Sequence, residues 1–432
     1  MRRNVKINLP YLLIPSPSSP GFRMPHTLTI NGRPYCFPTH PTVVICIDGS
    51  EPGYIEAAIQ TGRAPTFARF MRDGANLLAD SAIPSFTNPN NLSIITGRPP
   101  AVHGIAGNFF FDPATGQEVM MNDPKFLRAP TILAAFQDAG ARVAMVTAKD
   151  KLRLLLSNGL DYSTGRAIAF SSEKADKATN RDNGIADVLG FVGKPLPDVY
   201  SADLSEFVFA AGVKMLATFK LDLMYLSTTD YIQHKAAPGS KIANDFYATI
   251  DGYLAEMDKL GAIIVATADH GMNDKHNKDG SPQAVYLQSL IDGWLGAGAA
   301  RVILPITDPY VAHHGALGSF ATVYLAKPDA SLAERIRAVP GIDLVLTNEE
   351  ACARFELPPD RVGDLVVLSG KHMTIGTSAV RHDLSGLDEP LRSHGGLHEQ
   401  RVPMIANRRV TLPAGHALRN FDVFDVALNR IS

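Results

Sequence analysis

Cysteine is scarce in this sequence, and its distribution argues against a disulfide framework. The chain has three cysteines among 432 residues, Cys36, Cys46 and Cys352, which are far apart and form no CxxC pair. An odd number of scattered cysteines does not suit a secreted, disulfide-bonded protein. We therefore expect a reducing, cytoplasmic environment.

The sequence also lacks a surplus of charge of one sign, and it lacks long apolar runs. Lysine and arginine number 41 against 43 aspartate and glutamate residues, so the formal net charge is -2. Without a basic surface no nucleic-acid partner is expected, and a small anionic substrate would have to be bound by local charges. The short apolar run near the N-terminus is broken by prolines, so we expect no signal peptide and no membrane span. Residues 1–24 are expected to form a flexible tail.

The sequence does contain an alternation of strand and helix patterns. With 45% hydrophobic residues, its length suits one large α/β domain with an insertion, or two domains. Continuous apolar runs of strand length occur at 42–47, 142–147, 221–226 and 262–267. Helical patterns between and around them cover 52–60, 65–73, 130–139, 204–219 and 240–260. This alternation predicts a doubly wound, mostly parallel sheet.

The remaining patterns predict how the chain is divided. A tail and a β-hairpin with an Asn31-Gly32 turn occupy residues 1–40, and the first part of the core occupies 41–280. Residues 281–380 read as a smaller α+β cap, and 381–432 complete the core with a strand at 402–405 and a helix near 422–430. The cap elements expected are a helix at 331–337, a strand at 342–346, a helix at 349–355 capped by Asn348, and a strand at 363–369.

Three of the apolar strands end in an aspartate. These residues are Asp48, Asp230 and Asp269. Because ligands bind outside the carboxyl ends of the strands in an open α/β sheet, the three carboxylates should converge on one edge. Each aspartate taken alone could simply cap a helix or turn. Three buried like charges together favour a site that binds cations.

Histidines near these aspartates point to a transition metal. His234 follows Asp230 by four residues, His270 is adjacent to Asp269, and His398 lies in a glycine-rich loop further along the chain. Mixed carboxylate and imidazole ligands suit zinc, with manganese or iron as alternatives. In the same loop we assign His394 mainly to structural support, and we assign His103 to packing around the site.

Thr87 is the candidate nucleophile. It precedes Asn88-Pro89 and a helical pattern at 90–95. A hydroxyl at a helix N-terminus lies where backbone N–H groups and the helix dipole favour negative charge. A metal ion would further lower its pKa. The alternative is a plain helix N-cap.

Taken together, these motifs resemble the alkaline phosphatase superfamily, in its nucleotide pyrophosphatase/phosphodiesterase-like branch. The matching pieces run in the order of that family and span most of the chain. They are Asp48-Gly49, Phe86-Thr87-Asn88, residues 96–98 through 103–105, Asp230 with His234, residues 269–272, and His398.

The resemblance implies a three-layer α/β core and a two-metal site. One divalent ion, most simply Zn²⁺, would be held by Asp230, His234 and His398. The second would be held by Asp48, Asp269 and His270, with Thr87 as a further ligand and as the nucleophile. Asn108 corresponds to the asparagine that contacts a phosphoryl oxygen in that family. No organic cofactor is implied.

Within that branch the chain most resembles the phosphonoacetate hydrolases, because of two lysines. Lys149 and Lys151 follow the strand at 142–147 and could hold the carboxylate of a small phosphonate. The alternative is a pair of solvated lysines that open a helix. A second charged group, Glu173, Lys174 and Lys177, is expected to be a solvated face.

Three other functions remain open. A nucleotide phosphodiesterase or phosphatase of the same superfamily would use the same metals and Thr87. A phosphomutase is a second alternative, because residues 363–368 resemble cap segments of such enzymes. A non-catalytic phosphonate-binding or metal-storage protein is the third. A homodimer is also left open.

Overall fold

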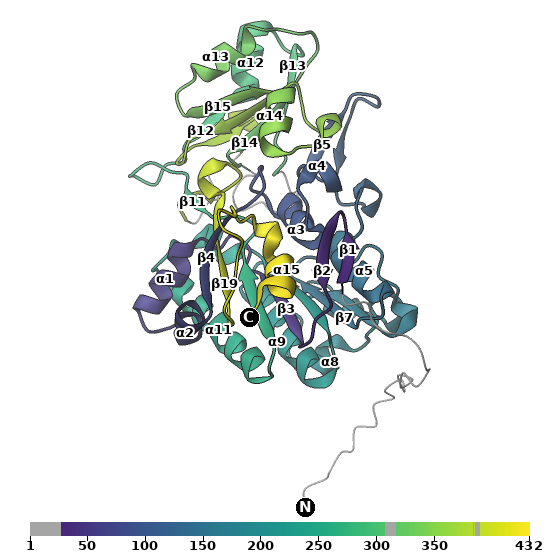
Figure 1. The fold of residues 1–432 in the computed structure, drawn as a ribbon. Coiled ribbons are helices and arrows are strands. Elements are labelled where there is room, and N and C mark those ends of the chain that lie inside the picture. The colour runs from purple at the N-terminus through teal and green to yellow at the C-terminus, as the bar shows by residue number, and fades with distance from the viewer. Residues whose placement is uncertain (1–26, 307–316, 383, 385–388) are drawn as a thin grey trace, which may run out of the picture.

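The computed structural model describes residues 27–306, 317–382, 384 and 389–432. A large α/β core and a smaller α+β unit at one end make up these residues (Figure 1). The tail expected at residues 1–24 lies outside the described residues. No helix in the described ranges is both long enough and apolar enough to cross a membrane.

A seven-stranded sheet forms the middle layer of the core. Its strand order is β4-β19-β10-β3-β9-β7-β8. Six strands run parallel to one another, whereas β19 is antiparallel to both of its neighbours, β10 and β4. The bounds are β3 (Thr42–Cys46), β4 (Ala75–Asp80), β7 (Val143–Thr147), β8 (Ala167–Ser171), β9 (Leu223–Ser227), β10 (Ile263–Thr267) and β19 (Arg401–Ala406). The predicted mostly parallel α/β sheet is therefore confirmed.

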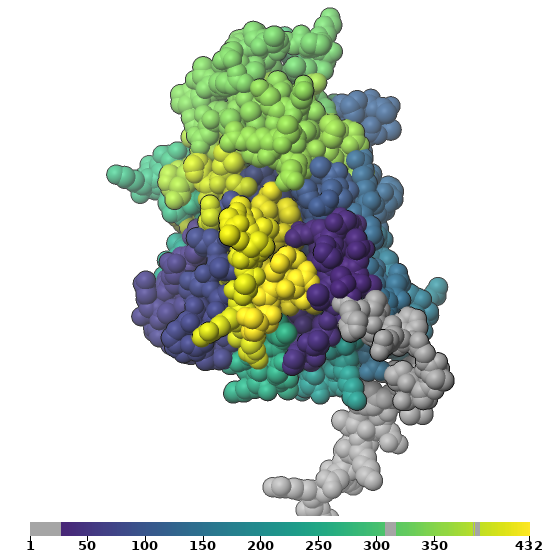
Figure 2. Space-filling view, viewed as in Figure 1, coloured from purple at the N-terminus to yellow at the C-terminus, as the bar shows by residue number. Residues whose placement is uncertain are grey.

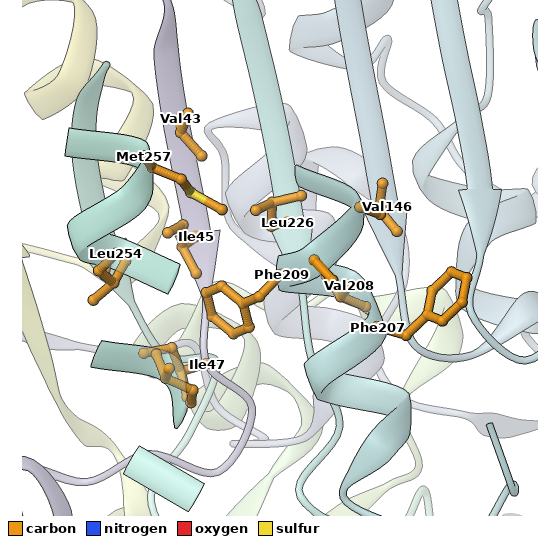
Figure 3. Close-up of a cluster of buried hydrophobic side chains, with 14 of the residues drawn as sticks. Val43, Ile45, Ile47, Val146, Phe207, Val208, Phe209, Leu226, Leu254 and Met257 are labelled. Atoms are coloured by element: carbon orange, nitrogen blue, oxygen red, sulfur yellow. The ribbon is translucent and has the colours of Figure 1, made fainter. Parts of the chain in front are cut away.

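Six helices of the described residues contribute buried side chains to the core on one face of this sheet. They are α1 (Pro52–Gln60), α2 (Pro65–Asp73), α8 (Val188–Val192), α9 (Asp203–Thr218), α10 (Tyr231–Lys235) and α11 (Lys241–Lys259). Phe209 of α9 and Met257 of α11 reach toward Ile45 and Leu226 of the central strands (Figure 3). All four of these side chains are buried. Because the strands β3, β7 and β9 are buried along their whole length, they read as continuous apolar runs in the sequence.

The other face is covered by four helices and a hairpin. The helices are α3 (Thr87–Thr96), α5 (Ile132–Asp138), α6 (Asp150–Leu156) and α15 (Val423–Asp425), the last continued by a π-helical turn at Val426–Arg430. The hairpin β1 (Thr27–Ile30) and β2 (Arg33–Cys36) lies beside the C-terminal segment (Figure 2). Asn429 holds the two together, because its side chain bonds the Cys36 amide and the Pro34 carbonyl. The predicted Asn31-Gly32 turn is present, with both residues at positive φ.

The smaller unit has its own sheet and core. Four antiparallel strands follow the order β13-β14-β16-β15, and three helices pack on them. The bounds are α12 (Leu287–Leu295), β13 (Ala300–Ile303), β14 (Phe320–Leu325), α13 (Leu332–Arg337), β15 (Ile342–Thr347), α14 (Asn348–Phe355) and β16 (Leu365–Ser369). We refer to this unit as the cap. The domain limits at residues 40, 280 and 380 stay a prediction.

Several local predictions need correction. The sequence patterns missed the edge strands β4 and β8 and the hairpin β5 (Phe109–Asp112) and β6 (Gln117–Met120). The cap of α14 is Thr347, not Asn348. The Thr347 hydroxyl accepts from the Glu350 amide, while the Glu350 carboxylate bonds back to the Thr347 amide. Asn348 instead donates to backbone carbonyls in the 359–363 turn.

Candidate active site

The three predicted carboxylates meet at one edge of the sheet. They follow β3, β9 and β10, which are neighbouring parallel strands, so their carboxyl ends lie side by side. Asp48 and Asp269 are buried, and Asp230 keeps 16% of its side chain exposed. Gly49 has φ +70° and lies so close to Asp230 that a Cβ would be 2.9 Å from the aspartate Cβ. The Asp48-Gly49 turn thus lets two carboxylates approach each other.

Each of three buried histidines turns one ring nitrogen toward these carboxylates. Nε2 of His234 lies 2.9 Å and Nε2 of His394 lies 3.6 Å from Asp230 Oδ2. Nε2 of His270 lies 3.2 Å from Asp48 Oδ1. The opposite nitrogens, Nδ1, each face a backbone carbonyl at 2.8–2.9 Å, those of Arg392, Ser85 and Gly271 respectively. A carbonyl can only accept, so Nδ1 carries the proton and Nε2 is left as a ligand, as in metal-binding histidines.

The loop histidine in this cluster is His394, not His398. His398 is 37% exposed, and its Nε2 lies 2.7 Å from Asp343 Oδ2 in the cap. His394 is buried and stacks on His270 with ring centroids 3.6 Å apart and an interplanar angle of 5°. We therefore correct the prediction for His398.

The glycine that follows His394 lets the loop come this close. Gly395 has φ +118°, and a Cβ there would lie 2.2 Å from the Phe86 ring. A side chain at position 395 would therefore force the loop away from Phe86. It would also move His394 away from the carboxylates.

Within the described parts of the chain, two groups could hold a metal ion. Asp230, His270 and His394 form one, and Asp48, Asp269 and His270 form the other, with the ligand atoms of each group within 4.8 Å of one another. Asp48 Oδ1 is buried and, among the described residues, makes no aligned hydrogen bond. A buried carboxylate oxygen in that state fits a cation ligand.

The charges of the cluster also favour a cation. Burial, and then repulsion from Asp269 and Asp230, raises the pKa of Asp48 well above its usual value. Burial favours the neutral ring of His270, but Asp269 and Asp48 outweigh it and raise the pKa of His270 to about 10. Without cations, Asp48 and Asp269 would therefore tend to take up protons, because their pKa values are raised. Burial also opposes the charge of Asp230, but His234 and His394 outweigh it and hold the pKa of Asp230 well below its usual value. Divalent ions would remove the repulsion between the carboxylates.

Thr87 lies at the edge of this cluster. It is the first residue of α3, and Phe86 holds the N-cap position, so the threonine hydroxyl is not used as the helix cap. The hydroxyl oxygen lies 3.4 Å from Nε2 of His270. The helix N-terminus favours negative charge on this oxygen.

Sequence reasoning missed Asn91, which joins Thr87 to the carboxylates. Its amide nitrogen donates to the Thr87 carbonyl and to Asp269 Oδ2, both at 3.1 Å. Its amide oxygen accepts from the Tyr225 and Ser227 hydroxyls at 2.7 and 2.8 Å. The i, i+4 spacing from Thr87 was the only signal in the sequence.

A cavity of about 360 Å³ brings the predicted substrate ligands to the same place. Thr87, Asn108, Lys149 and Lys151 line it, together with Asp48, Asp230, His234 and His394. The Lys149 ammonium donates to the Val199 carbonyl at 3.3 Å, and that of Lys151 lies 4.0 Å from the Met120 sulfur. Both lysines therefore approach the cavity from the N-terminus of α6.

The expectation of a purely solvated face at 173–177 is corrected here. Glu173 and Lys174 also line the cavity, and the Glu173 carboxylate accepts from the Asp150 amide at 2.8 Å. Lys177 is 75% exposed, as expected. His103 packs under α3 with its Nε2 2.9 Å from the Ser93 hydroxyl, in agreement with a packing role.

Comparison with solved structures gives a close match over nearly the whole chain. Two crystal structures of phosphonoacetate hydrolase from Sinorhizobium meliloti 1021, one with phosphonoformate and one with phosphonoacetate, are 62% identical in sequence with a TM-score of 0.91. The match covers 93% of this chain and 98% of theirs. Murine ectonucleotide pyrophosphatase/phosphodiesterase 5 shares the fold at 19% identity and a TM-score of 0.58, over 89% of this chain and 93% of that one.

Sequence comparison points to the same group of proteins. An uncharacterized pyrophosphatase/phosphodiesterase of Schizosaccharomyces pombe is 32% identical over 21% of this chain, and ectonucleotide pyrophosphatase/phosphodiesterase 2 of Saccharomyces cerevisiae is 32% identical over 26%. The aligned parts span only 18% and 24% of these two relatives. The model of the type I phosphodiesterase/nucleotide pyrophosphatase family matches residues 42–396. The chain therefore belongs to the type I phosphodiesterase/nucleotide pyrophosphatase family.

Proposed function

We propose that the chain is a metal-dependent hydrolase that cleaves the carbon–phosphorus bond of phosphonoacetate to acetate and phosphate. One observation supports this most directly: one cavity is lined by Thr87, by both lysines and by four members of the carboxylate and histidine cluster, Asp48, Asp230, His234 and His394. The 62% identity to a phosphonoacetate hydrolase, over nearly the full length of both chains, supports the choice of substrate. The three scattered cysteines, which are free, fit our proposal of a cytoplasmic location.

Two sets of residues would hold divalent ions. We propose Asp230, His234 and His394 for one ion, and Asp48, Asp269 and His270 with Thr87 for the other. Nitrogen and oxygen ligands of this kind suit Zn²⁺, and Mn²⁺ or Fe²⁺ are alternatives. When bound, such ions lower the pKa of a hydroxyl or water and stabilise negative charge on oxygen.

Thr87 is the proposed nucleophile. Thr87 loses its hydroxyl proton to solvent water and its oxygen attacks phosphorus, so that the oxygen–phosphorus bond forms and the phosphorus–carbon bond breaks. The electron pair passes to the methylene carbon and is delocalised into the neighbouring carboxylate. Protonation of that carbon by water gives acetate. A second water then hydrolyses phosphothreonine, which releases phosphate and restores Thr87.

Lys149 and Lys151 are the positive charges proposed to stabilise this anionic leaving group. Both residues line the cavity, and we propose that their ammonium groups bind the substrate carboxylate and stabilise the charge that develops on it. Asn108 borders the same cavity and is proposed to donate to a phosphoryl oxygen.

A nucleotide phosphodiesterase or phosphatase is the second candidate, because the matching family model has that description. The two functions share metals and nucleophile and differ in the leaving group. We would measure kcat/KM for phosphonoacetate, a nitrophenyl phosphate monoester and a nitrophenyl phosphate diester on the same metal-loaded preparation. We expect the highest value for phosphonoacetate. A higher value for the diester would favour the second candidate.

A further inference from the structure

Lys275 is a fully buried lysine that the proposed mechanism does not use. Its side chain has 0% exposure, as has that of its ion-pair partner Glu399. The ammonium makes three hydrogen bonds, to the Ser319 hydroxyl at 2.6 Å, the Lys371 carbonyl at 2.7 Å and Glu399 Oε1 at 2.9 Å. Ser319 immediately precedes β14 and Lys371 follows β16, so two of these three partners come from the cap.

Glu399 connects this lysine to both histidine-bearing loops. Its Oε2 accepts from the Gly396 amide at 2.9 Å, two residues after His394. Its backbone carbonyl accepts from the Gly271 amide at 2.7 Å, one residue after His270. The side chain thus fixes one loop, and the main chain of the same residue fixes the other.

The cap contacts the same loop at two further points. The Ser319 amide donates to the His394 carbonyl at 2.9 Å. His398, whose ring turns away from the carboxylate cluster, reaches Asp343 of β15. The loop at residues 394–399 therefore begins with a histidine of the metal cluster, His394, and ends with a buried charge, Glu399. The cap contacts this loop at His394 and at His398.

An ion pair this deeply buried is a poor source of stability. Removing both charges from water is costly, and their attraction offsets that cost only when the geometry is good. Burial lowers the pKa of Lys275, while Glu399 opposes that shift. Because the pair adds little stability, its role is better explained by fixing the position of a loop.

We propose that Lys275 and Glu399 are positioning residues that hold His394 and His270 in ligand geometry. Through the hydrogen bonds of Lys275 to the cap, that geometry also depends on the position of the cap. The inference rests on the proposed metal site, because it assigns a purpose to these residues only if the two histidines bind metal. Neither residue lines the cavity, so neither is expected to contact substrate.

The test is the Zn²⁺ affinity of a Glu399→Gln variant, measured by competition with a chromogenic chelator. Glutamine keeps the shape of the side chain but removes its charge. We expect affinity to fall about 10- to 100-fold, the usual effect of changing a group that orients a metal ligand. The Zn²⁺ measurement needs no substrate and is made on protein whose circular dichroism matches wild type.

Asp258→Asn is the matched control. Asp258 is 14% exposed and accepts from Arg69, Arg408 and Asn407 near the start of β10, at the other end of the sheet. This variant should lose stability yet keep its Zn²⁺ affinity. Equal losses of affinity in both variants would reduce the Lys275–Glu399 pair to a general structural role and overturn the proposal.

A milder variant keeps the proposal testable if Glu399→Gln does not fold. Ser319→Ala removes one cap-side acceptor from Lys275 and leaves the ion pair in place. It should weaken Zn²⁺ binding measurably, and unchanged affinity would contradict the tie to the cap. If wild-type protein itself binds no Zn²⁺, the proposed function fails. If wild type binds Zn²⁺ and the folded variants bind it equally well, only this inference fails.

Discussion

The hydroxyl of Thr87, the first residue of a helix, lies 3.4 Å from Nε2 of His270, the histidine that forms a ligand group with Asp48 and Asp269. This contact puts the proposed nucleophile next to the group of ligands that would hold a cation. The backbone amides of the helix N-terminus and the cation would favour the alkoxide of Thr87 over its neutral hydroxyl.

Removal of the nucleophile should nearly abolish turnover without loss of the bound metal ions. For Thr87→Ala we expect kcat with phosphonoacetate to fall by roughly a thousand-fold or more, because the covalent route is lost. Thr87→Ser keeps a hydroxyl and should lose much less. Phosphate release measures turnover, and metal analysis of each variant checks that the ligands are still occupied. Near-wild-type turnover in Thr87→Ala with metal bound would refute the phosphothreonine route.

Variants of the two loop histidines, His394 and His398, should differ in the amount of metal that they bind. His394→Ala removes a proposed ligand, so one of the two ions should be lost on dialysis. His398→Ala removes only an exposed pair with Asp343, worth about 0–1 kcal/mol, and should keep both ions. The measurement is metal stoichiometry by elemental analysis. If His398→Ala lost metal and His394→Ala kept it, our reassignment would be wrong.

Loss of either cavity lysine should affect carboxylated substrates much more than substrates without a carboxylate. Lys149→Ala or Lys151→Ala removes a charged hydrogen-bond donor worth about 1.5–3 kcal/mol, so KM for phosphonoacetate should rise about 10- to 100-fold. The same variants should change kinetics with nitrophenyl phosphate far less. Lys177→Ala, at an exposed lysine that pairs with Asp176, is the control. Equal losses on both substrates would exclude the carboxylate-binding role.

Acid should destabilise the fold through His103. Burial, aided by the charge of Arg361, lowers the pKa of His103 to about 3. In the unfolded chain this ring takes up a proton below about pH 6.5, whereas the folded protein does not until about pH 3. The free energy of unfolding is therefore highest above pH 6.5 and falls as the pH drops, by about 1 kcal/mol from pH 6.5 to 5.5 for this residue.

A His103→Asn variant isolates this effect. Denaturant unfolding of chelated protein at both pH values should show a smaller drop for the variant, by about that 1 kcal/mol. Asparagine will also lower the free energy of unfolding at every pH, because it loses the contact with Ser93. The test therefore compares how the free energy of unfolding changes with pH in the variant and in the wild type, and not its absolute value. Parallel pH profiles would show that His103 is already protonated in the native protein at pH 5.5.

The sequence could predict the sheet edge because the signals are local. Asp48, Asp230 and Asp269 each follow an apolar strand, and parallel strands end at a common edge, so their convergence needed no knowledge of distant contacts. Strand β8 was missed because its sequence, AIAFS, is short and alanine-rich. Strand β4, ANLLAD, lies at the sheet edge, is only partly buried and has polar residues at two of its six positions.

The loop histidine could not be chosen from the sequence, because its orientation depends on residues far away. His394 is turned inward by the carbonyl of Ser85, and Gly395 passes over the ring of Phe86. His398 is drawn outward by Asp343. These partners lie between 55 and 309 residues away along the chain, and no local pattern carries that information.

The most direct test of the account is the release of acetate and phosphate from phosphonoacetate by the purified protein. Both products are measured together by NMR, before chelation, after chelation, and after Zn²⁺ is returned. We predict equal amounts of acetate and phosphate, loss of both with the chelator, and recovery with Zn²⁺. Undiminished product release from chelated, metal-free protein, or no acetate from the metal-loaded protein, would contradict it.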